Sequence, residues 1–226
     1  MKKYAVIVAG GTGTRIGGSV PKQFLNLQGH PILWYPLNTF LKAFDDLEII
    51  LVVAKEQFQV AGNIITSLQF PERISLSTGG PTRFHSVKNG LQQVEQRSVV
   101  FVHDGVRCLL SSQLIQRCYE TTLKRGNAIP AIPSVDSIRM ETANGNQVLN
   151  RDQVKIIQTP QTFDSEILKA AYDQPYDESF TDDASVVERI GIKIHLVEGE
   201  ETNFKITRPI DMLIAERILE ARGLIS

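Results

Sequence analysis

The residues best suited to chemistry in this 226-residue chain lie in a glycine-rich segment near its N-terminus. A short apolar run leads directly into Gly10, Gly11 and Gly13, and two cations, Arg15 and Lys22, follow. Glycines after a strand let the backbone turn tightly and bring its amides close to phosphate oxygens. Arginine can bind two phosphate oxygens at once, and lysine adds a compact charge. The segment therefore suits a triphosphate.

This segment matches neither of two common phosphate-binding motifs. The P-loop ends in Gly-Lys-Ser/Thr, whereas Gly18 is followed here by Ser19 and Val20. The dinucleotide-binding fingerprint requires a third glycine where this chain has Ile16. Because a bare glycine-rich turn also occurs as a structural turn with solvated charges, that interpretation stays open at this point.

The composition excludes several classes of function. With 24 Lys and Arg against 25 Asp and Glu, the net charge of −1 provides no overall field for a nucleic acid. Cys108 and Cys118 have neither a zinc-ligand spacing nor the number needed for a disulfide framework. No apolar run approaches the ~20 residues needed to span a bilayer. We expect a cytoplasmic protein that binds neither nucleic acid nor membrane.

The elements that must position these residues alternate between strand-like and helix-like segments. Apolar runs, mostly of continuous Val and Ile, predict buried strands at residues 4–9, 48–53, 99–103 and 128–132. Helices are expected at residues 30–44, 58–68, 84–94, 114–124, 165–172 and 181–190, with a strand at 193–197 and a closing helix from Pro209. This order predicts an α/β fold, a Rossmann-like and mostly parallel sheet with helices on both faces, in one domain over residues 1–226.

One stretch, residues 133–155, interrupts the alternation. A turn at residues 142–146 separates two polar strands, expected at residues 137–141 and 147–151, and this pattern predicts a protruding β-hairpin arm. Such a pair is marginal in water unless something packs on it. A partner subunit would supply that surface.

Several further motifs follow the glycine-rich segment in a fixed order. They are Pro21-Lys22-Gln23, Gly79-Gly80-x-x-Arg83-x-x-Ser86-Val87, His103-Asp104-Gly105-Val106-Arg107, Gln158-Thr159-Pro160-Gln161, Thr181-Asp182-Asp183-Ala184-Ser185 and Asn203-Phe204-Lys205-Ile206-Thr207. The first of these, with the glycines, resembles the signature of the sugar nucleotidyltransferases. The whole set resembles the 2-C-methyl-D-erythritol 4-phosphate cytidylyltransferases of the non-mevalonate isoprenoid pathway. The resemblance covers essentially the whole chain.

The resemblance implies an activity and a set of roles. CMP would pass from CTP to 2-C-methyl-D-erythritol 4-phosphate, giving 4-diphosphocytidyl-2-C-methyl-D-erythritol and pyrophosphate. Arg15 and Lys22 would stabilise the negative charge of the transition state. Lys205 and Arg151 would position the acceptor phosphate, with Arg151 reaching the site of the neighbouring subunit. Residues implied to bind CTP are Ala9, Gly10, Gly11, Gly13, Gly80 and Ser86, and those implied to bind the acceptor are Asp104, Arg107, Ser137 and Thr159.

The same resemblance implies Mg²⁺ held mainly by the CTP phosphates, without a named protein ligand, and a homodimer whose subunits share their active sites. No general base is expected, because the acceptor phosphate is already ionised near neutral pH. Three positions depart from the family pattern. Pro81 stands where many relatives have an acidic residue and lacks a backbone donor. Cys108 replaces a common proline, and Ser137 replaces a threonine but keeps its hydroxyl.

Three other functions stay open from the residues. Ribitol-5-phosphate cytidylyltransferase shares nearly all these motifs, although the patterns at residues 80–91 and 151–159 look more like the methylerythritol enzyme. A nucleotide-sugar glycosyltransferase usually needs Asp-x-Asp after a central strand, where this chain has Asp104-Gly105-Val106. A noncatalytic nucleotide-binding domain could keep the glycines but would have no use for both Arg15 and Lys22.

Overall fold

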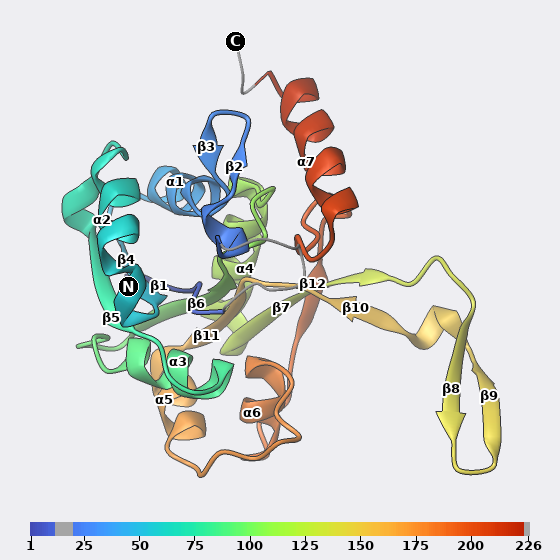
Figure 1. Cartoon of the computed structure of the whole chain (residues 1–226). Helices are drawn as coiled ribbons and strands as arrows, with labels where there is room; N and C mark the ends of the chain where they lie inside the picture. Colours follow the sequence, from blue (N-terminus) through green and yellow to red (C-terminus); the bar gives the residue numbers. More distant parts are fainter. Residues whose placement is uncertain (12–19, 224–226) are drawn as a thin grey trace.

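The computed structural model describes residues 1–11 and 20–223, and within this part eight strands form one central sheet (Figure 1). Four of them are parallel neighbours: β5 (Ile74–Thr78), β4 (Leu47–Val53), β1 (Lys2–Val8) and β6 (Ser98–Asp104), in that spatial order. All seven residues of β6 are buried. The continuous apolar runs therefore do form strands covered on both faces, as the sequence pattern predicts.

The second part of the sheet was only partly predicted. It contains β7 (Asn127–Pro133), β10 (Lys155–Ile157), β11 (Gln161–Asp164) and β12 (Leu196–Glu198). Strand β11 lies antiparallel between β6 and β7, and β10 pairs antiparallel with β7. Strands β5, β10 and β11 were missed, because they are short and lack the long Val and Ile runs of the others. The fold is α/β with a mostly parallel sheet, as expected.

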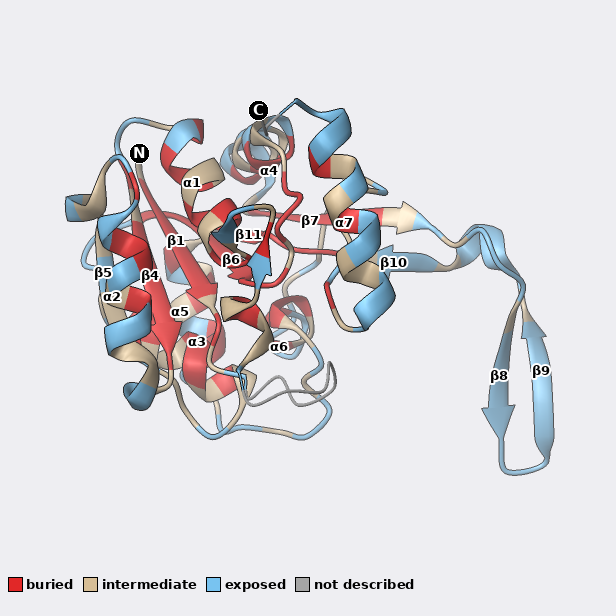
Figure 2. Ribbon diagram, turned by 45° about the horizontal axis from the view of Figure 1, so that its top comes forward, coloured by how far each residue is buried: buried red, intermediate tan, exposed pale blue. Residues whose placement is uncertain are grey.

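Helices cover both faces of the sheet (Figure 2). One apolar cluster joins the sheet to α1 (Trp34–Ala43), α2 (Phe58–Thr66) and α4 (Ser112–Arg125). The cluster on the opposite face includes α3 (Arg83–Leu91), α5 (Ser165–Tyr172) and α6 (Asp183–Glu188). A third cluster places α7 (Pro209–Ala221) against β2 (Asn26–Leu27) and the segment after β6.

Local signals explain where several helices begin and end. The Ser111 hydroxyl accepts a hydrogen bond from the Leu114 amide at 3.0 Å, and Gly126 closes α4 with a left-handed φ of 84°. Two predicted helices begin later than expected. Residues His30–Pro31 form β3, which pairs with β2, so α1 begins only at Trp34. Asp182 caps α6, which therefore begins at Asp183.

The stretch that interrupts the alternation extends from the body as an antiparallel pair, β8 (Ile138–Thr142) and β9 (Gly145–Leu149) (Figure 1). We call residues 133–155 the arm. Most of its surface is exposed to solvent (Figure 2). The exposed fraction is 74% for Val135 and 67% for Val148. Arg151 lies in a short 3₁₀ turn after β9, not in the strand expected there. The role of the arm in dimerisation stays a prediction.

No helix of the described ranges has both the length and the apolar character that crossing a membrane requires.

Candidate active site

A cavity of about 480 Å³ opens where the parallel strands β1, β5 and β6 end. Its wall comes from the segments after these strands, the start of α3 and the loop that precedes α7. In open α/β sheets, ligands bind at this edge because the strand ends direct their loops toward a common space. The fold thus brings five separated sequence motifs to one place.

The glycine-rich segment forms one wall of this cavity. Ala9, Gly10 and Gly11 line it, together with Lys22, whose Nζ donates a hydrogen bond to the Ile206 carbonyl at 3.0 Å. Two predicted site residues, Gly13 and Arg15, lie outside the described residues. The predicted phosphate-binding segment is therefore at the cavity, as far as the structure describes it.

Gln23 supports this wall, a role that the sequence interpretation missed. Its side chain is 2% exposed, and its Nε2 donates hydrogen bonds to the carbonyls of Ala9, at 2.7 Å, and Gly11, at 3.0 Å. These two bonds hold the backbone on either side of Gly10. The available signal was the place of Gln23 beside Lys22 in the Pro-Lys-Gln motif.

A second wall contains Gly80 and Ser86, both expected to bind the base. The Gly80 amide donates to the Ser86 hydroxyl at 3.0 Å, and this hydroxyl donates to the Thr82 carbonyl at 3.0 Å. A side chain on Gly80 would collide with His85, which explains the glycine. The Ser86 hydroxyl therefore stabilises the loop through two hydrogen bonds. One of its oxygen lone pairs stays available to accept a hydrogen bond from a ligand.

Among the described residues that line the cavity, Asp104 is the carboxylate, and it lies near several cations. It lies at the end of β6, is 8% exposed, and faces three cations among the described residues. Arg83 Nε lies 3.3 Å from Oδ1, whereas Lys205 Nζ and Arg107 Nε lie 3.1 and 3.6 Å from Oδ2. Burial alone would raise the pKa of Asp104, but these cations lower it below its usual range. The carboxylate is ionised at neutral pH.

Arg83 lines the cavity and connects Asp104 to Asp183, which does not line it, and neither Arg83 nor Asp183 had been assigned a role. Arg83 Nη1 and Nη2 donate to the two carboxylate oxygens of Asp183 at 2.9 and 2.7 Å. The Tyr172 hydroxyl also donates to Asp183 at 2.6 Å. Burial opposes the charge of Arg83, yet Asp183 and Asp104 hold its pKa well above the usual value. The sequence signals were the Gly-Gly-x-x-Arg and Thr-Asp-Asp motifs, and neither motif indicated that the two residues meet.

Thr159 and Arg107 lie behind Asp104, not in the cavity wall where direct acceptor contacts had been expected. The Asp104 amide donates to the Thr159 hydroxyl at 3.1 Å, and this hydroxyl lies 3.0 Å from His103 Nδ1. Arg107 Nη1 donates to the Asn203 carbonyl at 2.9 Å. Both side chains therefore support the position of Asp104 and its loop.

His103 completes this support as a neutral group. Its Nε2 lies 3.2 Å from the Arg107 carbonyl, which can only accept, so Nε2 carries the proton and Nδ1 accepts from Thr159. Burial lowers the pKa of His103 to about 4. The imidazole is thus uncharged at neutral pH, and its two hydrogen bonds link Thr159 to the Arg107 carbonyl within the protein.

Ser137 and Arg151 are on the exposed arm and do not line the cavity of their own chain. Arg151 Nη1 donates to the Val135 carbonyl at 3.2 Å, a contact within the arm itself. The structure of one chain therefore separates these two predicted residues from the others.

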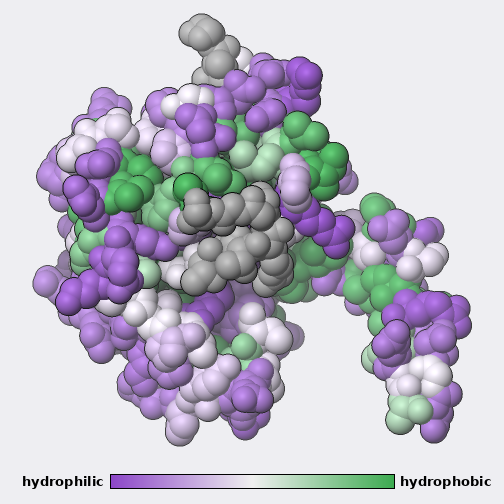
Figure 3. Space-filling view, viewed as in Figure 1, coloured by the Kyte–Doolittle hydropathy of each residue, from purple (hydrophilic) through white to green (hydrophobic). Residues whose placement is uncertain are grey.

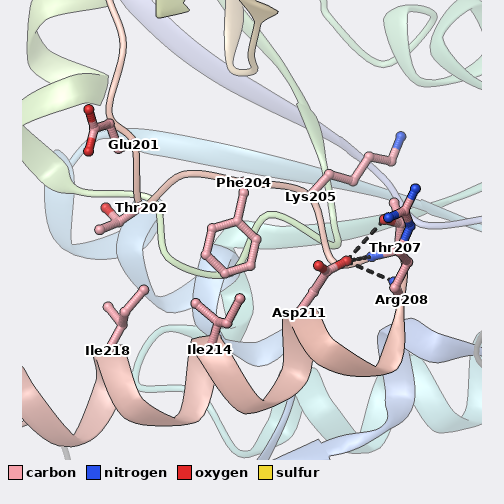
Figure 4. Close-up of a pocket in the computed structure, with 9 residues that line it drawn as sticks. All are labelled: Glu201, Thr202, Phe204, Lys205, Thr207, Arg208, Asp211, Ile214 and Ile218. Atoms are coloured by element: carbon pink, nitrogen blue, oxygen red, sulfur yellow. Dashed lines mark hydrogen bonds between the residues drawn. The ribbon is translucent and has the colours of Figure 1, made fainter. Parts of the chain in front are cut away.

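A second pocket, of about 460 Å³, lies between the loop before α7 and α7 itself (Figure 4). Phe204, Ile214 and Ile218 form its apolar side, and Lys205 and Thr207 belong to both this pocket and the cavity. Figure 3 shows apolar surface along α7 and at the root of the arm. The exposed apolar residues of α7 are Ile210, Leu213 and Ile214.

The described residues of the cavity offer few donor atoms for a metal ion. The described residues contain no group of three or more His, Cys, Asp and Glu side chains placed to hold a metal. Among the described residues that line the cavity, Asp104 supplies the only carboxylate, and cations already surround it. The described lining therefore offers a magnesium ion at most one carboxylate, and any such ion would depend on substrate phosphates and water for its other ligands.

Comparisons with known proteins agree over nearly the whole chain. A sequence model of the family described as 2-C-methyl-D-erythritol 4-phosphate cytidylyltransferase matches residues 4–221. Proteins of that name from Bacteroides fragilis and Bacteroides thetaiotaomicron are each 43% identical over 219 residues, covering 97% of this chain and 100% of the relative. The crystal structure of 4-diphosphocytidyl-2C-methyl-D-erythritol synthase from Anaerococcus prevotii is 28% identical, covers 97% of this chain and 96% of that chain, and gives a TM-score of 0.84.

Proposed function

The chain belongs to the 2-C-methyl-D-erythritol 4-phosphate cytidylyltransferase family, and we propose that it transfers CMP from CTP to 2-C-methyl-D-erythritol 4-phosphate with release of pyrophosphate. The observation that carries this proposal is the family match over residues 4–221, combined with a cavity at which the family motifs meet. The family names of the relatives favour this acceptor over ribitol 5-phosphate.

The reaction requires alignment and positive charge from the protein. A phosphate oxygen of the acceptor attacks the α-phosphorus of CTP, a new P–O bond forms, and the bond to the β-phosphate breaks as pyrophosphate leaves. No proton has to be removed from the attacking oxygen, because the acceptor phosphate is ionised near neutral pH. Negative charge increases on the α-phosphate and on pyrophosphate, where Lys22 and Arg15 would stabilise it.

The acceptor would lie on the side of the cavity that contains Asp104 and Lys205. An ionised carboxylate accepts hydrogen bonds, so Asp104 can hold the polyol hydroxyls. Lys205 would bind the acceptor phosphate, because it lines the cavity and its side chain is 41% exposed. Residues Gly80 and Ser86 would hold the pyrimidine at the second wall described above. Mg²⁺, when bound, supplies positive charge to the triphosphate.

We assign the arm to dimerisation. A two-stranded hairpin without packing is marginal in water, and this arm exposes Val135 and Val148. The pocket beside Lys205 and the apolar surface of α7 offer a place for a partner's arm (Figure 4). In a C₂ dimer the same patch is buried on both chains, so Arg151 of each subunit would serve the other active site.

We also propose a cytoplasmic location for this protein. Cys108 and Cys118 are both free and buried, and burial raises the pKa of each thiol to about 12. Unpaired structural cysteines of this kind suit a reducing compartment.

Pyrophosphate release provides the test. The purified protein is incubated with CTP, Mg²⁺ and either 2-C-methyl-D-erythritol 4-phosphate or ribitol 5-phosphate, and pyrophosphate is measured over time. We expect release that depends on the methylerythritol acceptor. A catalytic efficiency at least as high with ribitol 5-phosphate would assign the rival acceptor, and the absence of release with either acceptor would refute a cytidylyltransferase.

A further inference from the structure

Arg83 joins two parts of the molecule that the catalytic scheme leaves unconnected. One edge of its guanidinium, Nε, lies 3.3 Å from Asp104 Oδ1 at the end of β6. The other edge donates to both oxygens of Asp183, the first residue of α6. Arg83 itself begins α3, which Thr82 caps. A single side chain thus connects the acceptor side of the cavity to two helices.

The far end of this connection is anchored in the protein interior. Asp183 is fully buried, and the Tyr172 hydroxyl donates to it at 2.6 Å. The Tyr172 ring is stacked on Phe84, with 4.7 Å between ring centroids. Because Asp183 is held by α5 and α6, it fixes the guanidinium of Arg83 from behind.

The three cations around Asp104 differ in how firmly the protein holds them. Lys205 is the most exposed of them, at 41% for its side chain, against 29% for Arg83 and 13% for Arg107. Lys205 and Arg107 both approach Oδ2, whereas Arg83 approaches Oδ1. If Lys205 turns toward a substrate phosphate, Oδ1 of Asp104 keeps its own partner.

On the basis of the function proposed above, we propose that Arg83 is a positioning residue for acceptor binding. Held by Asp183, it fixes Asp104 and balances its charge, and this leaves Lys205 available for the acceptor phosphate. Lysine could not replace Arg83 here, because a single ammonium cannot bind two carboxylates through opposite edges as a guanidinium does.

The test uses a double variant, Arg83→Gln with Asp183→Asn, because Arg83→Gln alone would leave a buried charge unpaired. The double variant replaces the ion pair by two neutral amides that can hydrogen-bond. We expect it to fold and to raise KM for the acceptor about tenfold, with KM for CTP changed less than twofold. Arg83→Lys, which keeps the positive charge, should raise KM for the acceptor by a similar factor. Arg97→Gln, at an arginine that is 64% exposed outside the cavity, is the matched control.

The outcomes separate the two proposals. Steady-state kinetics are measured for the wild type, both Arg83 variants and Asp104→Asn, and folding is checked by circular dichroism. If Asp104→Asn raises KM for the acceptor but a folded Arg83 variant keeps the wild-type value, Arg83 has no positioning role. If Arg83 served only to stabilise the fold, the folded double variant would keep the wild-type KM for the acceptor, because the neutral pair replaces the ion pair. A wild type without acceptor-dependent pyrophosphate release would refute the proposed function and the role of Arg83 together.

Discussion

Asp104 and Arg151 are both expected to act on the acceptor, but the fold surrounds them in opposite ways. Asp104 is 8% exposed, faces three cations from separate segments, and has its amide held by Thr159. Arg151 is exposed on the arm and contacts the Val135 carbonyl nearby in the sequence. One chain therefore organises the Asp104 side of the site in advance, whereas Arg151 would reach an acceptor only through the dimer proposed above.

The largest effect is expected on the organised side of the site. Lys22→Ala should lower kcat by about 10² to 10³, because one oriented positive charge is lost from the transition state. Thermal unfolding should change little, since the lysine lies at the cavity wall. Stopped-time pyrophosphate assays and melting curves measure both effects, with the exposed Lys42→Ala as the control. Near-normal turnover of folded Lys22→Ala would remove Lys22 from the chemistry.

The buried His103, which supports Asp104 through Thr159, predicts that the free energy of unfolding depends on pH. Below pH 6.5 the unfolded chain binds a proton that folded His103 takes up only near pH 4, so the free energy of unfolding falls as pH falls through this window. The loss should reach about 3 kcal/mol, at roughly 1.4 kcal/mol for each pH unit. Chemical denaturation at several pH values measures it.

In His103→Gln, the free energy of unfolding should no longer fall between pH 6.5 and 4. The variant should also be less stable than the wild type at pH 7, because the Thr159 hydroxyl loses the imidazole that accepts its hydrogen bond. His30→Gln, at an exposed histidine, is the matched control. An unchanged slope between pH 6.5 and 4 in His103→Gln would mean that His103 is not the buried neutral group described here.

Mixed dimers test whether Arg151 on the arm acts in the active site of the other subunit. If Lys22→Ala and Arg151→Ala are each nearly inactive, a mixed dimer with Arg151 acting in trans has one site with both lesions and one intact site. Random exchange makes about half of the dimers mixed, so activity should recover to about a quarter of wild type. Two affinity tags establish that subunits exchange, and Arg139→Ala supplies a control on the same arm. Tagged mixed dimers that stay inactive would place Arg151 in its own subunit's function or in none.

The smallest effect is expected in the arm. Val148→Ser should change the free energy of unfolding of the diluted monomer by less than about 0.5 kcal/mol, because Val148 is 67% exposed. Val102→Ser in the fully buried strand β6 should cost about 2 kcal/mol or more. Denaturation at low concentration measures both. Val148→Ser should also weaken the dimer in sedimentation experiments, and an unchanged monomer–dimer equilibrium would place Val148 outside the interface.

Much of the fold could be predicted, because its signals are local. The Val and Ile runs of β1, β4 and β6 are long enough to identify buried strands, and the apolar residues at 128–132 indicate β7 despite Pro130. Strand β11 could not be placed in this way, since its four residues carry no such run and its antiparallel position depends on β6 and β7. The arm was visible as a break in the alternation of strands and helices.

The sequence by itself determined the family, the glycine-rich segment and the ionisable residues at the strand ends, because each depends on residue type and order. Only the tertiary structure decided which of these residues meet. Arg83 and Asp183 stand a hundred positions apart, and their ion pair exists because α3 and α6 pack on the same face of the sheet. Thr159 looked like an acceptor contact in its motif, but β11 and β6 place its hydroxyl behind Asp104. Such contacts depend on how distant elements pack, and no local preference of the chain encodes them.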